Sequence, residues 1–135
     1  MKKAIKKLKK KSGQAIVEMA LMLPLLLSIL CGVLDFGWIF VNQYKVEYAS
    51  YNGARYASIL VAQSDDHTSA KDAIEARVRN NLPDPDLGDI TVSINAGRKE
   101  VTIEISYPVK TLTFVAELLN PSGYYTASAS NTVVY

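Results

Sequence analysis

The sequence predicts an α+β protein in which a long N-terminal transmembrane helix continues into a small extracytoplasmic domain, with a second helix packed on a three-stranded antiparallel sheet. Three observations predict this class. A nearly unbroken apolar stretch covers residues 15–41, directly after a run of lysines. Apolar residues then recur at helical spacing as far as Leu82, and from Ile90 onward they alternate with polar residues as in strands. With 135 residues, the chain has room for one compact unit and an anchor.

The charges are divided unevenly along the chain. Seven of its 15 basic residues precede residue 12 without an acidic residue among them: Lys2, Lys3, Lys6, Lys7, Lys9, Lys10 and Lys11. The other eight Lys and Arg face all 13 Asp and Glu, so residues 14–135 carry a formal charge of −5. A basic arm is one way to bind nucleic acid. A cationic cluster beside an apolar stretch is, however, the usual topology signal, so we interpret residues 1–13 as a cytoplasmic leader and expect no nucleic-acid binding.

The apolar segment is long enough to span a bilayer. Residues 19–34 contain seven Leu, one Ile and one Val, which together favour insertion by about 3 to 5 kcal/mol. Glu18 and Asp35 flank this stretch about 25 Å apart along a helix, so each carboxylate is expected near one interface of the bilayer. Residues 14–41 are therefore the predicted transmembrane helix, and residues 42–135 the extracytoplasmic domain. Bulky residues follow instead of a small-x-small site, so we expect the helix to be retained rather than removed as a secretory signal.

The junction between the leader and the apolar segment contains Gly13, Gln14 and, four positions after Gln14, Glu18. Cleavage after Gly13 would remove all seven lysines and create an amine at Gln14. A carboxylate inside a membrane needs a partner, and the i to i+4 spacing places Glu18 on the same helix face as that amine, in its own chain or a neighbour. The alternative is that Glu18 lies unpaired and solvated at the headgroup boundary.

This junction, Pro24 in a leucine-rich helix and the continuation over residues 32–55 resemble the TadE-like minor pseudopilins of tight-adherence (Flp-type) pilus systems. The resemblance covers most of the chain and is specific over about residues 12–60. Major Flp pilins tend to place Tyr directly after the glutamate and are shorter than this chain. The presence of Met19 and the greater length favour a minor, TadE-like role.

The resemblance implies a pilin-like domain, in which a helix lies on an antiparallel sheet, and processing by a membrane-embedded prepilin peptidase. By position, Gly13 precedes the scissile bond, Gln14 is the mature N-terminus and Glu18 is the glutamate used in assembly. The implied partners are the bilayer, the peptidase, other pilins or pseudopilins and pilus assembly proteins. The implied function is adhesion or pilus biogenesis, at the cell membrane and in or at a pilus.

Beyond the membrane the helix is expected to continue to about residue 61. One face of this part carries Tyr44, Tyr48, Tyr51 and Arg55. A second face carries only small residues, Ala49, Gly53 and Ala57, which would let another helix or sheet approach closely. Two interpretations of the tyrosine face stay open. The rings cover the local core and the membrane interface, or they form a subunit contact surface.

A polar break over residues 63–69 should separate the long helix from a second one. Ser69 or Asp72 would cap this second helix, His67 would lie in the loop before it, and residues 83–88 would end it. Its apolar stripe consists of Ala70, Ile74, Val78 and Leu82.

Two strands should follow, over residues 90–94 and 101–107, joined by a loop that contains Gly97 and ended by Pro108. Residues 111–119 are expected to form a short helical turn over the sheet, followed by a turn at residues 120–123. Residues 125–134 read as a third strand whose small side chains would let the long helix lie close. Because a domain of this size is marginal alone, the outer half of the long helix should complete its core.

No residues form a recognisable catalytic arrangement, so the chain is not expected to be an enzyme or to hold a cofactor. Cys31, the single cysteine, excludes an intramolecular disulfide and is expected to be a buried apolar residue, with palmitoylation as the alternative. His67 lacks the partners that a metal site needs. Asp65–Asp66 and Asp84–Asp86 are better explained as turn residues than as calcium ligands. The alternative function is a single-pass, membrane-anchored binding or sensor domain that keeps its N-terminal tail.

Overall fold

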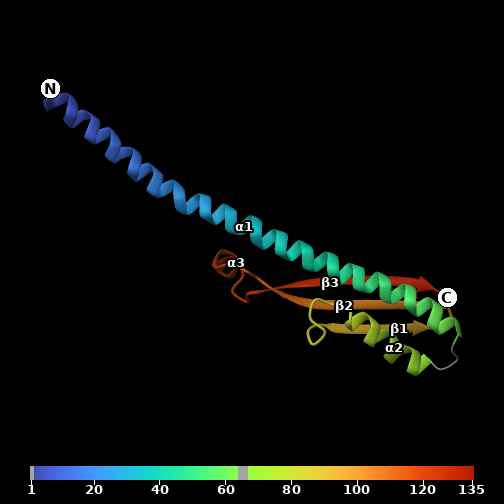
Figure 1. Cartoon of the computed structure of the whole chain (residues 1–135). Coiled ribbons are helices and arrows are strands. Elements are labelled where there is room, and N and C mark those ends of the chain that lie inside the picture. Colours follow the sequence, from blue (N-terminus) through green and yellow to red (C-terminus); the bar gives the residue numbers. More distant parts are fainter. Residues whose placement is uncertain (1, 64–66) are drawn as a thin grey trace.

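The computed structural model describes residues 2–63 and 67–135, and the side chains of residues 13–63 and 67–135. Along the chain lie α1 (Lys2–Gln63), α2 (His67–Arg79), β1 (Asp89–Asn95), β2 (Glu100–Lys110), α3 (Phe114–Leu119) and β3 (Tyr124–Val134). Figure 1 shows α1 as a long, gently curved rod whose second half lies along the sheet while its first half stands clear of it. The predicted α+β class is confirmed.

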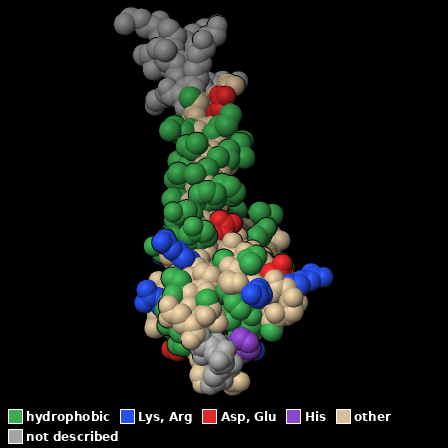
Figure 2. All heavy atoms as spheres, turned by 90° about the vertical axis from the view of Figure 1, so that its right-hand side faces the viewer, with side chains coloured by type: hydrophobic (Ala, Val, Ile, Leu, Met, Phe, Trp, Pro, Cys, Tyr) green, Lys and Arg blue, Asp and Glu red, His purple; other side chains and the backbone are tan. Residues whose placement is uncertain are grey.

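One uninterrupted helix, α1, provides both the free apolar segment and part of the domain core. From residue 16 to residue 41 its large apolar side chains are mostly exposed, and Figure 2 shows them as an apolar column above the domain. Within the helix, Pro24 has no N–H to donate, and the Ser28 hydroxyl donates to the Pro24 carbonyl at 2.8 Å. Both features are tolerated because the flanking residues keep the helical hydrogen bonds.

The sheet has the order β1-β2-β3, and both pairings are antiparallel. Ile103 in the central strand β2 pairs with Val92 in β1 and with Asn131 in β3. Alternate residues of β2 point to the same face, where α1 covers β2 and β3 while α2 covers β1 (Figure 1). The core therefore lies between one layer of helices and one sheet, and the outer half of α1 completes it as predicted.

The small-residue face of α1 permits the close packing that the sequence predicts. Ala49 and Ala57 are fully buried, and a Cβ added at Gly53 would lie 2.3 Å from Val78 Cγ2 of α2 and 3.1 Å from Ile103 Cδ1 of β2. Only a residue without a side chain lets α1 approach both neighbours at once.

The second helix starts earlier than predicted. α2 begins at His67, so Ser69 and Asp72 lie inside it rather than at its cap, and His67 is an exposed first residue rather than a loop residue. Boundaries of this kind are the least certain part of a sequence-based prediction, because local patterns place helix ends only to within a few residues. The predicted break falls partly on residues 64–66, which lie outside the described residues. The apolar stripe of α2 and its continuation in Leu82 are buried as expected.

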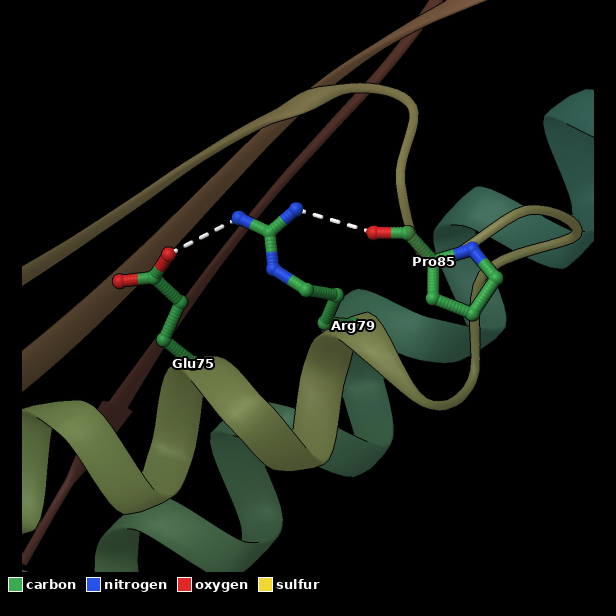
Figure 3. A network of polar contacts seen from close by, with 3 residues as sticks. All are labelled: Glu75, Arg79 and Pro85. Carbon is green, nitrogen blue, oxygen red and sulfur yellow. Dashed lines mark hydrogen bonds and ion pairs between the residues drawn. The ribbon is translucent and has the colours of Figure 1, made fainter.

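Arg79 connects the end of α2 to the loop that follows it. Its Nη2 lies 2.9 Å from Glu75 Oε1, one helical turn earlier, and its Nη1 donates to the Pro85 carbonyl at 3.0 Å (Figure 3). In the same loop, the Asp86 N–H donates to Asp84 Oδ1 at 3.0 Å. Asp84 therefore acts as a turn residue, as the sequence predicts.

One strand boundary differs from prediction. Pro108 does not end β2, which continues to Lys110 and pairs Pro108 with Thr126 of β3. This is possible because β1 pairs only as far as Ser106, so the missing N–H of Pro108 lies beyond the end of the neighbouring strand. The predicted loop between β1 and β2 contains Gly97, and a positive φ of 54° in this loop belongs to Lys99.

The segment after β2 contains the predicted helical turn, α3, but not in the predicted place. α3 contacts α1 instead of lying over the sheet (Figure 1). The turn that follows α3 forms as expected, with the Gly123 N–H donating to the Asn120 carbonyl at 2.9 Å and a Gly123 φ of 66°. The position of α3 follows from contacts made by Asp35, which the next section describes.

Candidate functional site

The predicted cleavage junction lies within α1. Gly13 and Gln14 are both helical and exposed, and apart from the adjoining helix no described atom lies within 4 Å of a Cβ built on Gly13. The helix continues through the junction in both directions. An enzyme that cuts between these residues must therefore open the helix locally.

Glu18 lies one helical turn after Gln14 and is exposed. Among the residues whose side chains are described, none forms an ion pair with the Glu18 carboxylate. The ion pair found among these residues joins Arg79 and Glu75 in α2. Met19 and Met22, on the lipid-facing part of the helix, are exposed as well. A carboxylate at this position in a membrane requires a partner.

Asp35, which the sequence places only as a border carboxylate, is the buried polar centre of the contact between α1 and the C-terminal part of the chain. Only 4% of its surface is exposed. Its Oδ1 accepts the N–H groups of Leu112 at 2.8 Å and of Thr113 at 3.0 Å, and its Oδ2 accepts the Thr113 hydroxyl. A carboxylate that accepts three hydrogen bonds needs no ion pair to be stable in a buried position.

This arrangement supplies a helix cap from a distant part of the chain. Thr113 is the N-cap residue of α3, yet its own side chain makes no capping hydrogen bond. The hydroxyl instead donates to Asp35, which also accepts the N–H group of this N-cap residue, one of the N–H groups at a helix start that have no partner within the helix. The residue pattern that hints at this site is an acid in an apolar helix together with a threonine before a short apolar run.

A seam of polar contacts continues from Asp35 along the face of α1 that meets the sheet. Trp38 Nε1 donates to the Lys110 carbonyl at 3.1 Å, and Gln43 Nε2 donates to the Ser128 carbonyl at 2.8 Å. Deeper in the domain, Asn131 Nδ2 donates to the buried Ser50 hydroxyl at 3.0 Å. These contacts attach α1 to β2 and β3 over several helical turns, so the free part of α1 and the domain form one unit.

The predicted tyrosine face of α1 points away from the core. Tyr44, Tyr48 and Tyr51 are each more than half exposed, and Arg55 is exposed too. Tyr51 and Arg55 also line a shallow groove between α1 and the edge strand β3. The rings therefore do not cover the domain core, and their polar and aromatic surface is available to another molecule.

The described residues contain no group of three or more His, Cys, Asp or Glu side chains close enough to hold a metal ion. Asp65 and Asp66 lie outside the described residues. Cys31 is half-buried on the free part of α1, and His67 is exposed at the start of α2. In the described part of the chain, the candidate functional features are thus the junction, Asp35 and the tyrosine face.

Most of α1 also resembles a known protein family. In the described part of the chain, one helix, Gly13–Gln63, is long and apolar enough to cross a membrane. No curated protein and no solved structure matches the chain. A family model does match, over residues 13–55. That segment starts at the junction, contains Glu18 and Asp35, and ends at Arg55. Over these residues the resemblance predicted from the sequence is confirmed, and the matching family is that of the TadE-like proteins.

Proposed function

We propose that this chain is a minor, TadE-like pseudopilin, a prepilin cut after Gly13 by a prepilin peptidase and then assembled with a tight-adherence pilus machine. The observation that carries the proposal is the start of the family match at Gly13, the residue before the proposed scissile bond. The lysines of residues 2–11 lie outside the matched segment, as expected for a leader that the mature protein loses. The match also includes the whole span and continues into the domain.

The chemistry at the junction fits a peptidase that needs an extended substrate. Glycine is about 1 kcal/mol less favourable than alanine in a helix interior, so α1 opens at Gly13 more easily than at its neighbours. Cleavage there removes the cationic segment that holds the leader at the cytoplasmic surface.

The product of cleavage would supply a cationic partner for Glu18. The new amine at Gln14 lies one helical turn, about 6 Å of rise, from Glu18. Because a carboxylate in lipid is costly without a partner, Glu18 would pair with this amine or with the amine of an adjacent subunit. The second pairing would admit only processed subunits and would fix their axial register.

The tyrosine face supports the same role outside the membrane. Tyr44, Tyr48 and Tyr51 present large rings at low entropic cost, and Arg55 adds a charge that pairs well with carboxylates. Since these side chains are exposed in the single chain, we assign them to contacts with neighbouring subunits.

Mass spectrometry of the N-terminus tests the proposal. Protein purified from cells that contain the peptidase should begin at Gln14, and Gly13→Leu should leave the chain intact. Gly32→Leu is the matched control, since Gly32 also lies in α1 with open space around it, and this variant should be cleaved normally. An intact Met1 terminus on the unaltered protein would contradict the proposal and support a membrane-anchored binding or sensor domain instead.

A further inference from the structure

An unusually apolar surface lies at the end of the domain that faces the free part of α1. Four large apolar side chains are well exposed here: Leu112, Phe114, Leu118 and Leu119. The exposed fraction is 79% for Leu118 and 82% for Leu119. No residue of α3 is buried. Charge is also scarce here, because residues 105–135 contain only Lys110 and Glu117 as charged residues. A small soluble domain does not ordinarily display such a cluster without something to cover it.

The height of this surface along α1 is fixed by hydrogen bonds. Asp35 binds the N–H groups of Leu112 and Thr113, and Trp38 donates to the Lys110 carbonyl. α3 therefore lies beside α1 at the level of residues 35–38, as Figure 1 also shows. The contact is with α1 rather than with the sheet, so α3 does not contribute to the domain core.

The position of the bilayer along α1 follows from the sequence of the span. A hydrocarbon core about 30 Å thick needs about 20 helical residues. If Glu18 marks the cytoplasmic boundary, the opposite boundary falls near Trp38. The level of α3 therefore coincides with the outer edge of the hydrocarbon core. Trp38 and the exposed rings of Tyr124 and Tyr125 lie near this boundary, where such side chains are favoured.

Several polar groups around α3 find partners within the protein, which lowers the cost of placing this segment against lipid. The Thr111 N–H donates to the Gly123 carbonyl at 3.1 Å. Asn120 Nδ2 donates to the Tyr124 carbonyl at 2.8 Å, and the Asn120 N–H bonds back to Ala116 at 2.8 Å. In the described part of the chain, no buried side-chain polar atom lacks a partner.

We propose that α3 is a second, shallow membrane contact, with Phe114, Leu118 and Leu119 inserted into the outer leaflet beside the span. The apolar surface of α1 continues onto α3 at this level, so the lipid that surrounds the span is the occupant that the structure supports. Asp35 has the role of holding α3 in this position. The inference requires that α1 crosses the bilayer, but it does not depend on cleavage at Gly13 or on pilus assembly.

A fluorescent probe of lipid depth tests this contact in the full chain. Cys31→Ala removes the native thiol, and Leu118→Cys then carries an environment-sensitive dye in vesicles of phosphatidylethanolamine and phosphatidylglycerol. Val134→Cys is the matched control, an exposed apolar residue at the far end of β3. Lipids with a quencher near the headgroup should quench the Leu118 probe at least about two-fold more than the Val134 probe, because an interfacial helix inserts roughly 5–10 Å.

Equal, weak quenching of the two probes would overturn the proposal. So would a Leu118 probe whose emission depends on the protein-to-lipid ratio but not on the quencher, because a second copy of the chain would then cover α3. Asp35→Asn in the Leu118→Cys background gives a further check, since loss of the charged acceptor should lower the quenching. If quenching persists unchanged, Asp35 does not position α3. Failure of cleavage at Gly13 would leave all these outcomes unaffected.

Discussion

Asp35 and Thr113 lie 78 positions apart in the chain, yet the carboxylate of Asp35 accepts both the backbone N–H and the hydroxyl of Thr113. The pair joins the outer end of the apolar helix to the start of α3. Apolar packing and a few polar contacts of Trp38, Gln43 and Ser50 attach the rest of the domain to α1. The Asp35–Thr113 contact therefore fixes the end of the domain that faces the free part of α1.

We expect Asp35→Ala to weaken this attachment. The variant leaves the Leu112 and Thr113 N–H groups without their acceptor, so their amide hydrogens should exchange much faster than in the unaltered protein. The unfolding midpoint in detergent should also fall. Asp89→Ala removes an exposed carboxylate and should change neither measurement. Unchanged protection of the two amides would show that Asp35 is not their acceptor.

Substitution of Gly53 should reveal how close α1 lies to its neighbours. Gly53→Ala places a methyl group 2.3 Å from Val78 Cγ2, and the branched side chain of Val78 has little freedom to move. We expect a net loss of about 1–2 kcal/mol in the free energy of unfolding, since overpacking outweighs the gain in helix propensity. Denaturant titration measures it. Gly37→Ala, at an open position of the same helix, should be neutral or stabilising.

The Glu18 pairing predicts a separation of processing from assembly. Glu18→Ala should be cleaved almost normally but should assemble poorly, because the amine at Gln14 would lose its carboxylate. The amount of processed protein in sheared pili or in cross-linked complexes measures this. Glu47→Ala removes a carboxylate from the exposed outer part of α1 and should assemble normally. Normal assembly of Glu18→Ala would argue against the pairing, as would a cyclised Gln14.

The tyrosine face should matter for subunit contacts but not for folding. Tyr48→Ala removes an exposed ring, so the unfolding midpoint should stay the same while cross-linking to neighbouring subunits falls several-fold. Tyr56→Ala is the control. Tyr56 lies in the same helix, but its ring faces α2, with the guanidinium carbon Cζ of Arg77 5.9 Å from the ring centroid. If both variants assemble equally well, the exposed face is not the contact surface.

Tyr107 predicts how stability changes at high pH. Burial, and secondly the negative charge of Asp84, raises the pKa of Tyr107 above its ordinary value of 10.0. The fold thus favours the neutral phenol, and its contribution to stability is complete below pH 10 and is lost as the pH rises through the pKa of the folded state. Tyr107→Phe should make the alkaline decline in the unfolding midpoint shallower. Tyr48→Phe, which alters an exposed phenol, should leave the decline unchanged.

Local patterns predict most of the fold. The alternation of apolar residues in β1 and β2 corresponds to their buried face, and Ala49, Gly53 and Ala57 mark where α1 packs closely. These predictions succeed because each element must bury one face, and the spacing of apolar residues records which face it is.

The predictions that fail concern partners far away in the sequence. Pro108 can lie inside β2 only because β1 stops pairing at Ser106, and nothing near Pro108 indicates that limit. The role of Asp35 depends in the same way on Thr113, which lies far away in the chain. The sequence around Asp35 shows only an acid at the end of an apolar stretch, and this pattern does not reveal the partner. The junction residues Gly13, Gln14 and Glu18 stay a prediction.

The continuity of α1 has a mechanical consequence. The helix runs without a break from the anchor into the domain, so the stretch between Glu18 and Asp35 is a spacer of set length. Each residue added to it would lift the domain by about 1.5 Å and swing it about 100° around the helix axis. The number of residues in this spacer therefore sets the direction, around the helix axis, in which the tyrosine face points.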